Sequence, residues 1–246
     1  MLVALLTLCN ASCSSDGNEP DDPSSPGSNN SVVINSDGTA TGGAVFSRVD
    51  ANTFFLDYVK YKIVDSHLEI IGCDNSEISD EPKLYAEVTI DGVLYKTRYI
   101  ELLNGHKIKS VVIPETVTLI KYMAFTYCQS LTTVKFLGKR TVIDNCAFRG
   151  CESLTTVELP EELTTIGRYA FSECESLTTV ELPEKLTSIG DHAFSECWSL
   201  AELVFKGDVP LLGAGCIQSR PVAYVPMQYV DNYKKYADYF SEIIGY

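Results

Sequence analysis

Residues 153–175 read SLTTVELPEELTTIGRYAFSECE, and residues 176–198 read SLTTVELPEKLTSIGDHAFSECW. These two 23-residue units are identical at 18 positions. Less regular units begin at Lys107 and Ser130, and a half-unit begins at Ser199. A fixed period in the low twenties is the signature of a solenoid, in which each unit buries its apolar face only against its neighbours. The period therefore predicts the fold, and a residue that recurs in every unit is expected to be structural rather than catalytic.

The apolar residues of each unit predict a short strand. Leu154, Val157 and Leu159 form an L-x-x-V-x-L pattern, whose alternation turns one side of a strand inward. Pro160 ends the strand where no ladder N–H is needed, and Gly167 predicts a tight turn. Strands stacked at about 4.8 Å per turn form a parallel sheet along one face of a solenoid. We therefore expect a mainly β fold built from 23-residue repeats.

The residues that recur in phase, LxxVxLPxxLxxIGxxAFxxC, resemble the repeat of the BspA-like leucine-rich repeat family over residues 107–208. The resemblance implies a right-handed leucine-rich repeat solenoid in a surface protein that binds partners or mediates adhesion. One unit departs from the pattern, because Leu137 replaces the proline and Arg140 replaces an apolar residue. We expect that turn to be looser than its neighbours.

The segments on either side of the repeats have different patterns. Residues 44–106 alternate between apolar and polar side chains, and Asp91-Gly92 between two such runs predicts a two-residue hairpin turn. After Asp208 the repeat register is expected to end. Aromatic residues then recur at spacings of three and four, which predicts an amphipathic helix; they are Tyr229, Tyr233, Tyr236 and Phe240, with Ile243 and Ile244 beyond. We interpret both segments as caps for the open ends of the solenoid; a tyrosine-lined ligand pocket is the alternative for the second.

The first residues resemble a bacterial lipoprotein signal. Residues 1–8 are apolar but too few to span a bilayer. Cys13, preceded by Asn-Ala-Ser, resembles a lipobox cysteine, so we predict that it carries lipid. Cys9 is the competing candidate, but it follows Leu8 instead of a small residue. An ordinary cleaved signal, in which Cys13 has no role, is the other alternative. The polar residues 14–30 lack aliphatic and aromatic side chains and are expected to form a flexible stalk.

The predicted organisation has five parts: a signal peptide with lipobox at residues 1–13, a disordered linker at 14–43, a β-rich N-terminal cap at 44–106, the solenoid at 107–208 and a C-terminal cap with an amphipathic helix at 209–246. The chain has 19 basic and 33 acidic residues and a formal charge of −14. Without a basic run it has no nucleic-acid footprint, and an anionic membrane surface would repel it. Membrane contact is therefore predicted only through the lipid anchor.

Cysteines and glutamates recur at the same positions of successive units, where they could form disulfides or bind metal ions. The recurring cysteines are Cys128, Cys151, Cys174 and Cys197. Stacked Cβ atoms about 4.8 Å apart are poorly placed for a disulfide, and a line of thiols cannot converge on zinc. We predict buried free thiols and no metal or cofactor. Stacked glutamates such as Glu158 and Glu181 are interpreted as solvated charges; a Ca²⁺ bridge between them is the competing hypothesis.

The sequence contains none of the common catalytic or phosphate-binding motifs, so no enzymatic activity is predicted. An enzyme in the N-terminal region would require side chains such as Asp57, His67, Asp74 and Glu87 to converge.

The outward positions of the predicted strands are the expected binding surface, since exposed sheet faces of solenoids are extended contact surfaces. They include Ser110, Thr133, Lys135, Thr156, Glu158, Thr179, Glu181 and Glu202. These side chains favour a protein partner over stacked sugars or bases. The predicted function is a lipid-anchored interaction or adhesion module at the outer membrane or cell surface. The alternative is a glycan-binding lipoprotein of a nutrient-uptake system. Trp198 is expected to pack against the C-terminal cap, and an anchor for an interface is the alternative.

Overall fold

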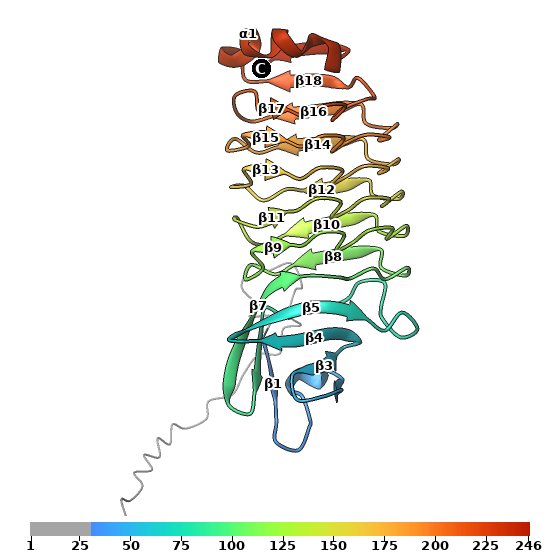
Figure 1. Cartoon of the computed structure of the whole chain (residues 1–246), viewed down its shortest axis with the longest axis vertical. Coiled ribbons are helices and arrows are strands. Elements are labelled where there is room, and N and C mark those ends of the chain that lie inside the picture. Colours follow the sequence, from blue (N-terminus) through green and yellow to red (C-terminus); the bar gives the residue numbers. More distant parts are fainter. Residues whose placement is uncertain (1–30) are drawn as a thin grey trace, which may run out of the picture.

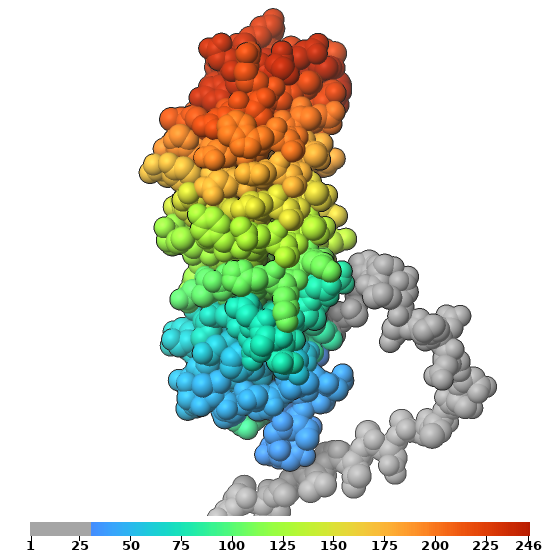
Figure 2. Space-filling view, turned by 90° about the vertical axis from the view of Figure 1, so that its right-hand side faces the viewer, coloured from blue at the N-terminus to red at the C-terminus, as the bar shows by residue number. Residues whose placement is uncertain are grey.

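The computed structural model describes residues 31–246, so the predicted signal, Cys13 and residues 14–30 lie outside the described residues. The described chain is an elongated stack of turns that rises from a β-rich N-terminal region to a short helix, α1 (Val230–Tyr233), at the C-terminal end (Figure 1). The same layers follow one another along the side of the molecule (Figure 2). No helix within residues 31–246 is long and apolar enough to cross a membrane.

Five successive turns each contribute one strand to each of two faces, and two more front strands follow at the C-terminal end. The front strands are β8 (Ser110–Ile113), β10 (Thr133–Phe136), β12 (Thr156–Glu158), β14 (Thr179–Leu182), β16 (Glu202–Phe205), β18 (Val222–Val225) and β19 (Glu242–Gly245). The back strands are β9 (Leu119–Ile120), β11 (Val142–Ile143), β13 (Thr165–Ile166), β15 (Ser188–Ile189) and β17 (Leu211–Leu212). Val134 pairs with Val157 and Ile143 with Ile166, both in parallel and both one repeat apart. The predicted parallel solenoid is confirmed.

The core consists of ladders of identical side chains. The rings of Phe125, Phe148, Phe171 and Phe194 stack with successive centroid distances of 4.9, 5.3 and 5.4 Å, and all four are fully buried. Beside them, the thiols of Cys151, Cys174 and Cys197 donate to the carbonyl oxygens of Phe125, Phe148 and Phe171 at 3.2, 3.3 and 3.1 Å. Burial raises the pKa of Cys197 to about 12. The predicted ladder of buried free thiols is confirmed.

The role predicted for the repeated glycine needs correction. Neither Gly167 nor the equivalent Gly190 has a positive φ. The left-handed positions come two residues after each glycine, at Tyr169 and His192, with φ of 55° and 56°. A Cβ atom on Gly167 would lie 2.6 Å from the backbone N of Asn145 and the carbonyl carbon of Asp144. Glycine is therefore required because the backbones of neighbouring turns approach closely.

The turn that departs from the repeat pattern keeps its pairing on both sides, since β11 pairs with β9 and with β13. Arg140 is exposed and forms an ion pair with Glu162. Thr141 is buried instead, and its hydroxyl donates to the carbonyl oxygen of Val117 at 2.9 Å. Thr141 thus occupies the inward position that the repeat pattern assigns to residue 140.

The N-terminal region is β-rich, as predicted, but begins earlier. It contains β1 (Ser31–Ile34), a 3-10 turn (Thr41–Gly43), β2 (Phe46–Arg48), β3 (Thr53–Leu56), β4 (Val59–Val64), β5 (His67–Cys73), β6 (Glu87–Ile90) and β7 (Val93–Ile100). β1 precedes the predicted boundary at residue 44, because Val32 and Ile34 are buried and β1 pairs in parallel with β6. The Asp91-Gly92 hairpin is confirmed, with φ of 51° and 77°. β7 pairs with β9 and so joins this region to the solenoid.

At the C-terminal end the repeat register continues further than expected. Leu211 of β17 pairs with Ser188, one repeat earlier, so the expectation that the register ends after Asp208 is wrong. The predicted helix is present but short: 3-10 turns at Met227–Tyr229 and Lys234–Tyr239 flank α1 (Val230–Tyr233). Ile243 and Ile244 lie in β19, which pairs with β18. Tyr233 and Phe240 are buried and pack against Phe205 at ring-centroid distances of 4.9 and 5.9 Å.

Trp198 is 62% exposed, so its predicted packing against the C-terminal end does not occur.

Candidate functional site

Outward side chains of the front strands form two rows. The first row is Ser110, Thr133, Thr156, Thr179, Glu202, Val222 and Glu242. The second row is Val112, Lys135, Glu158, Glu181, Val204, Tyr224 and Ile244. All eight residues predicted as the partner-binding surface lie in these rows. The structure therefore brings them onto one face.

The front sheet is interrupted between β12 and β14. β12 pairs with β10 and β14 pairs with β16, but β12 and β14 do not pair with each other. On the neighbouring turns Thr155 N donates to Thr132 O at 3.0 Å, and Ala201 N donates to Thr178 O at 2.9 Å. The equivalent bond from Thr178 to Thr155 is absent from this part of the described chain. Ser176 N still donates to Glu152 O at 3.1 Å, and β13 and β15 remain paired on the back face, so the interruption is confined to the front strands.

The charges on the two strands give a physical reason for the interruption. The two nearly identical units place Glu158 and Glu181 at equivalent positions, and like charges opposite each other destabilise a strand pair by up to about 1 kcal/mol. Each carboxylate instead contacts a lysine on its other side. Lys135 Nζ lies 3.8 Å from Glu158, and Lys206 Nζ lies 2.6 Å from Glu181. These exposed ion pairs join each strand to its neighbour on the far side of the interruption but do not cross it.

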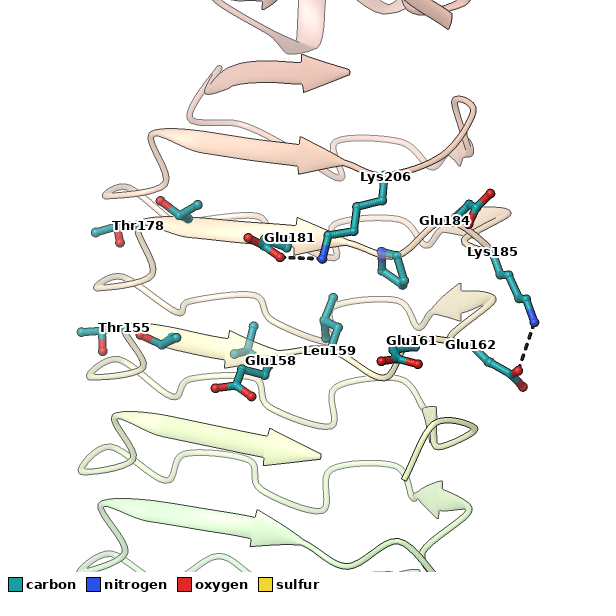
Figure 3. A pocket seen from close by; sticks show the side chains of 14 residues that line it. Thr155, Glu158, Leu159, Glu161, Glu162, Thr178, Glu181, Glu184, Lys185 and Lys206 are labelled. Atoms are coloured by element: carbon teal, nitrogen blue, oxygen red, sulfur yellow. Dashed lines mark hydrogen bonds and ion pairs between the residues drawn. The ribbon is translucent and has the colours of Figure 1, made fainter. Parts of the chain in front are cut away.

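A cleft of about 790 Å³ occupies the interruption (Figure 3). Threonines from both strands line it, together with Glu158, Glu161, Glu162, Glu181, Glu184, Lys185 and Lys206. Lys185 bridges the two units through Glu162 at 3.1 Å, and hydrogen bonds from Lys185 and then Arg140 lower the pKa of Glu162. The cleft thus offers hydroxyl groups, carboxylates and ammonium groups to a polar ligand, and its own ion pairs are exposed enough to exchange partners.

The front face also carries three residues that the sequence pattern did not predict, namely Tyr224, Val222 and Ile244. β18 follows β16 after 20 residues, because Glu202 pairs with Val222, and this shorter unit hides the repeat. The sequence does carry a signal, since Val225-Pro226 repeats the Leu182-Pro183 that ends β14. Tyr224 adds an aromatic side chain to a face whose eight predicted residues include none.

The structure does not support the two other hypotheses, a Ca²⁺ site on the stacked glutamates and an enzyme in the N-terminal region. Within residues 31–246 no group of three or more His, Cys, Asp or Glu side chains is arranged to hold a metal ion, so the Ca²⁺ hypothesis has no converging ligands. The residues required for an enzyme in the N-terminal region contact different neighbours. Asp57 accepts a hydrogen bond from Tyr85 at 2.6 Å, Asp74 accepts one from Ser76 at 2.6 Å, and Glu87 pairs with Lys96 at 2.9 Å.

Comparison with known proteins places the repeats in a family. A family model described as a BspA type leucine rich repeat region matches residues 100–221 in six copies. The crystal structure of a leucine-rich repeat protein of T. pallidum is 19% identical, with a TM-score of 0.56 over 81% of this chain and 99% of that chain. A leucine-rich cell surface protein from Faecalibacterium prausnitzii A2-165 is 22% identical, with a TM-score of 0.51 over 74% of this chain and 54% of that chain. No curated protein matches. At these identities the structural likeness shows the fold alone.

Proposed function

Because this chain belongs to the BspA type leucine-rich repeat family, we propose that it is an exported, lipid-anchored interaction module that binds a protein partner through the front strands. The observation that carries the proposal is the cleft between β12 and β14, which opens the sheet on the face that holds the outward rows. A similar structure is described as a cell surface protein, which supports an outward-facing role. Cys13 supplies the anchor in this proposal, and the polar residues after it supply the spacer.

A glycan is the second candidate ligand, because Tyr224 lies on the same face as the cleft. Sugar recognition commonly uses an aromatic ring beside hydrogen-bonding groups. The two candidates differ in where they bind. A protein partner is expected to depend on the cleft, whereas a stacked sugar is expected to depend on Tyr224.

Placing arginine at both Thr156 and Thr179 is expected to block the cleft. These threonines belong to the two strands that border it, and the larger side chains fill the space between them. Binding to immobilised extracellular proteins and glycans, measured by surface plasmon resonance, is expected to weaken at least about tenfold, or about 1.4 kcal/mol.

Thr165→Arg is the matched control, since this exposed threonine of the same unit lies on β13 at the back. It is expected to bind like the wild type. Protein binding that survives the double substitution would contradict a role of the cleft. Glycan binding that is lost in Tyr224→Ala but retained in the double variant would favour the second candidate.

A further inference from the structure

A second cavity lies far from the cleft, where β5 begins and where β7 meets the start of β9. It measures about 410 Å³ and is lined by Ser66, His67, Lys96, Arg98, Tyr99 and Thr118. His67 and Lys96 are register partners on β5 and β7, so they share one face of the sheet. A register shift after Leu68 places Tyr99 opposite Glu69. Strand pairing therefore gathers these side chains.

The charged groups that line this cavity are all basic, although the chain as a whole has a formal charge of −14. Lys96 contacts Glu87 at 2.9 Å, which neutralises part of its charge. The guanidinium of Arg98 forms no ion pair or hydrogen bond within residues 31–246, and its side chain is exposed. An unpaired guanidinium presents donors in a fixed fork that matches the two oxygens of an oxyanion.

His67, which also lines the cavity, is held in place by its neighbours. Its ring packs edge-on against Tyr99 at 4.9 Å, and its Nε2 is buried, makes no hydrogen bond and lies 3.5 Å from Glu69 Oε1. Glu69 also accepts a hydrogen bond from Lys121 at 3.0 Å. Although burial acts in the opposite direction, the contact with Lys121 lowers the pKa of Glu69, so its carboxylate stays charged beside the ring. The imidazole is therefore fixed at the wall of the cavity.

We propose that this cavity binds one oxyanion group, a sulfate or a carboxylate, carried by an acidic ligand. Arg98 contacts the anion as a fork, Lys96 adds a second positive charge, and the hydroxyl groups of Ser66 and Tyr99 supply further donors. The site is independent of the proposed protein-binding cleft, because it involves β5, β7 and the start of β9 rather than β12 and β14 (Figure 1).

The test is a titration of the ¹⁵N-labelled protein with sodium sulfate, and separately with sodium acetate, at an ionic strength kept constant with sodium chloride. We expect saturable shifts of backbone amide signals around residues 66–67 and 96–99 with at least one of the two anions. Arg98→Ala is expected to raise the Kd at least about tenfold, which corresponds to about 1.4 kcal/mol. Arg98→Lys keeps the positive charge but lacks the forked donors, so its Kd is expected to lie between those of the wild type and Arg98→Ala.

Arg168→Ala is the control, because Arg168 is an exposed arginine outside the cavity that pairs with Asp191 at 3.4 Å. It is expected to leave the Kd unchanged. The amide spectra recorded before titration show whether each variant is folded. Shifts that rise linearly without saturation for both anions, or equal Kd values for wild type and Arg98→Ala, would overturn the proposal. The anion with the lower Kd distinguishes a sulfated ligand from a carboxylate ligand.

Discussion

Phe148→Ala is expected to lower the free energy of unfolding by about 3–5 kcal/mol, the range for removing a buried phenylalanine. Phe148 is fully buried and stacks between Phe125 and Phe171, with ring planes 9° and 4° from parallel. Its edge also contacts Phe136 at 6.4 Å. Because each turn contacts only its neighbours, the cavity weakens the coupling between the two halves of the solenoid. Urea unfolding followed by circular dichroism measures the loss.

Trp198→Ala is the control for this substitution. It also removes a large aromatic side chain from the repeats, but from a position that is 62% exposed. We expect a change of less than about 0.5 kcal/mol, as for most surface substitutions. Equal losses for Phe148→Ala and Trp198→Ala would show that the stacked rings do not hold the turns together.

Gly167→Ala is expected to destabilise the protein by about 1–3 kcal/mol, the usual range for overpacking. The added Cβ would lie 2.6 Å from backbone atoms of Asp144 and Asn145, and backbone cannot rotate away as a side chain does. The two turns must therefore separate locally. Thermal unfolding measures the shift in Tm.

Gly38→Ala separates this steric effect from conformational strain. Gly38 has a φ of 82°, but a Cβ there would meet no atom within 4 Å. Alanine at this position is expected to cost about 1 kcal/mol through backbone strain alone. If Gly167→Ala leaves the Tm unchanged, the close approach of the two backbones does not constrain the sequence.

The regular part of the fold could be predicted because each unit repeats the same physical problem. Val157, Phe171 and Cys174 recur in phase, and periodic burial follows directly from their spacing. The function of Gly167 could not be read in the same way, because both a positive φ and a close backbone approach favour glycine. Only the distance between neighbouring turns separates the two explanations.

The candidate site was predictable in part. The outward positions follow from strand alternation, and the stacked glutamates were visible in the sequence. The missing pairing between β12 and β14, which lie in two nearly identical units, could not be predicted. It depends on which lysine each carboxylate contacts, and this requires side-chain positions. Tyr224 was hidden because its unit has 20 residues instead of 23.

The central claim, that the front strands face the outside of the cell, is tested most directly by labelling intact producing cells with a membrane-impermeant amine reagent. Lys135, Lys185 and Lys206 lie at the front face or its cleft with side chains more than half exposed. We expect these lysines to be modified in membrane-bound wild-type protein, and membrane association to be lost in Cys13→Ala. Membrane-bound protein with unmodified lysines that become reactive only after lysis would contradict the account and place the front face inside the envelope.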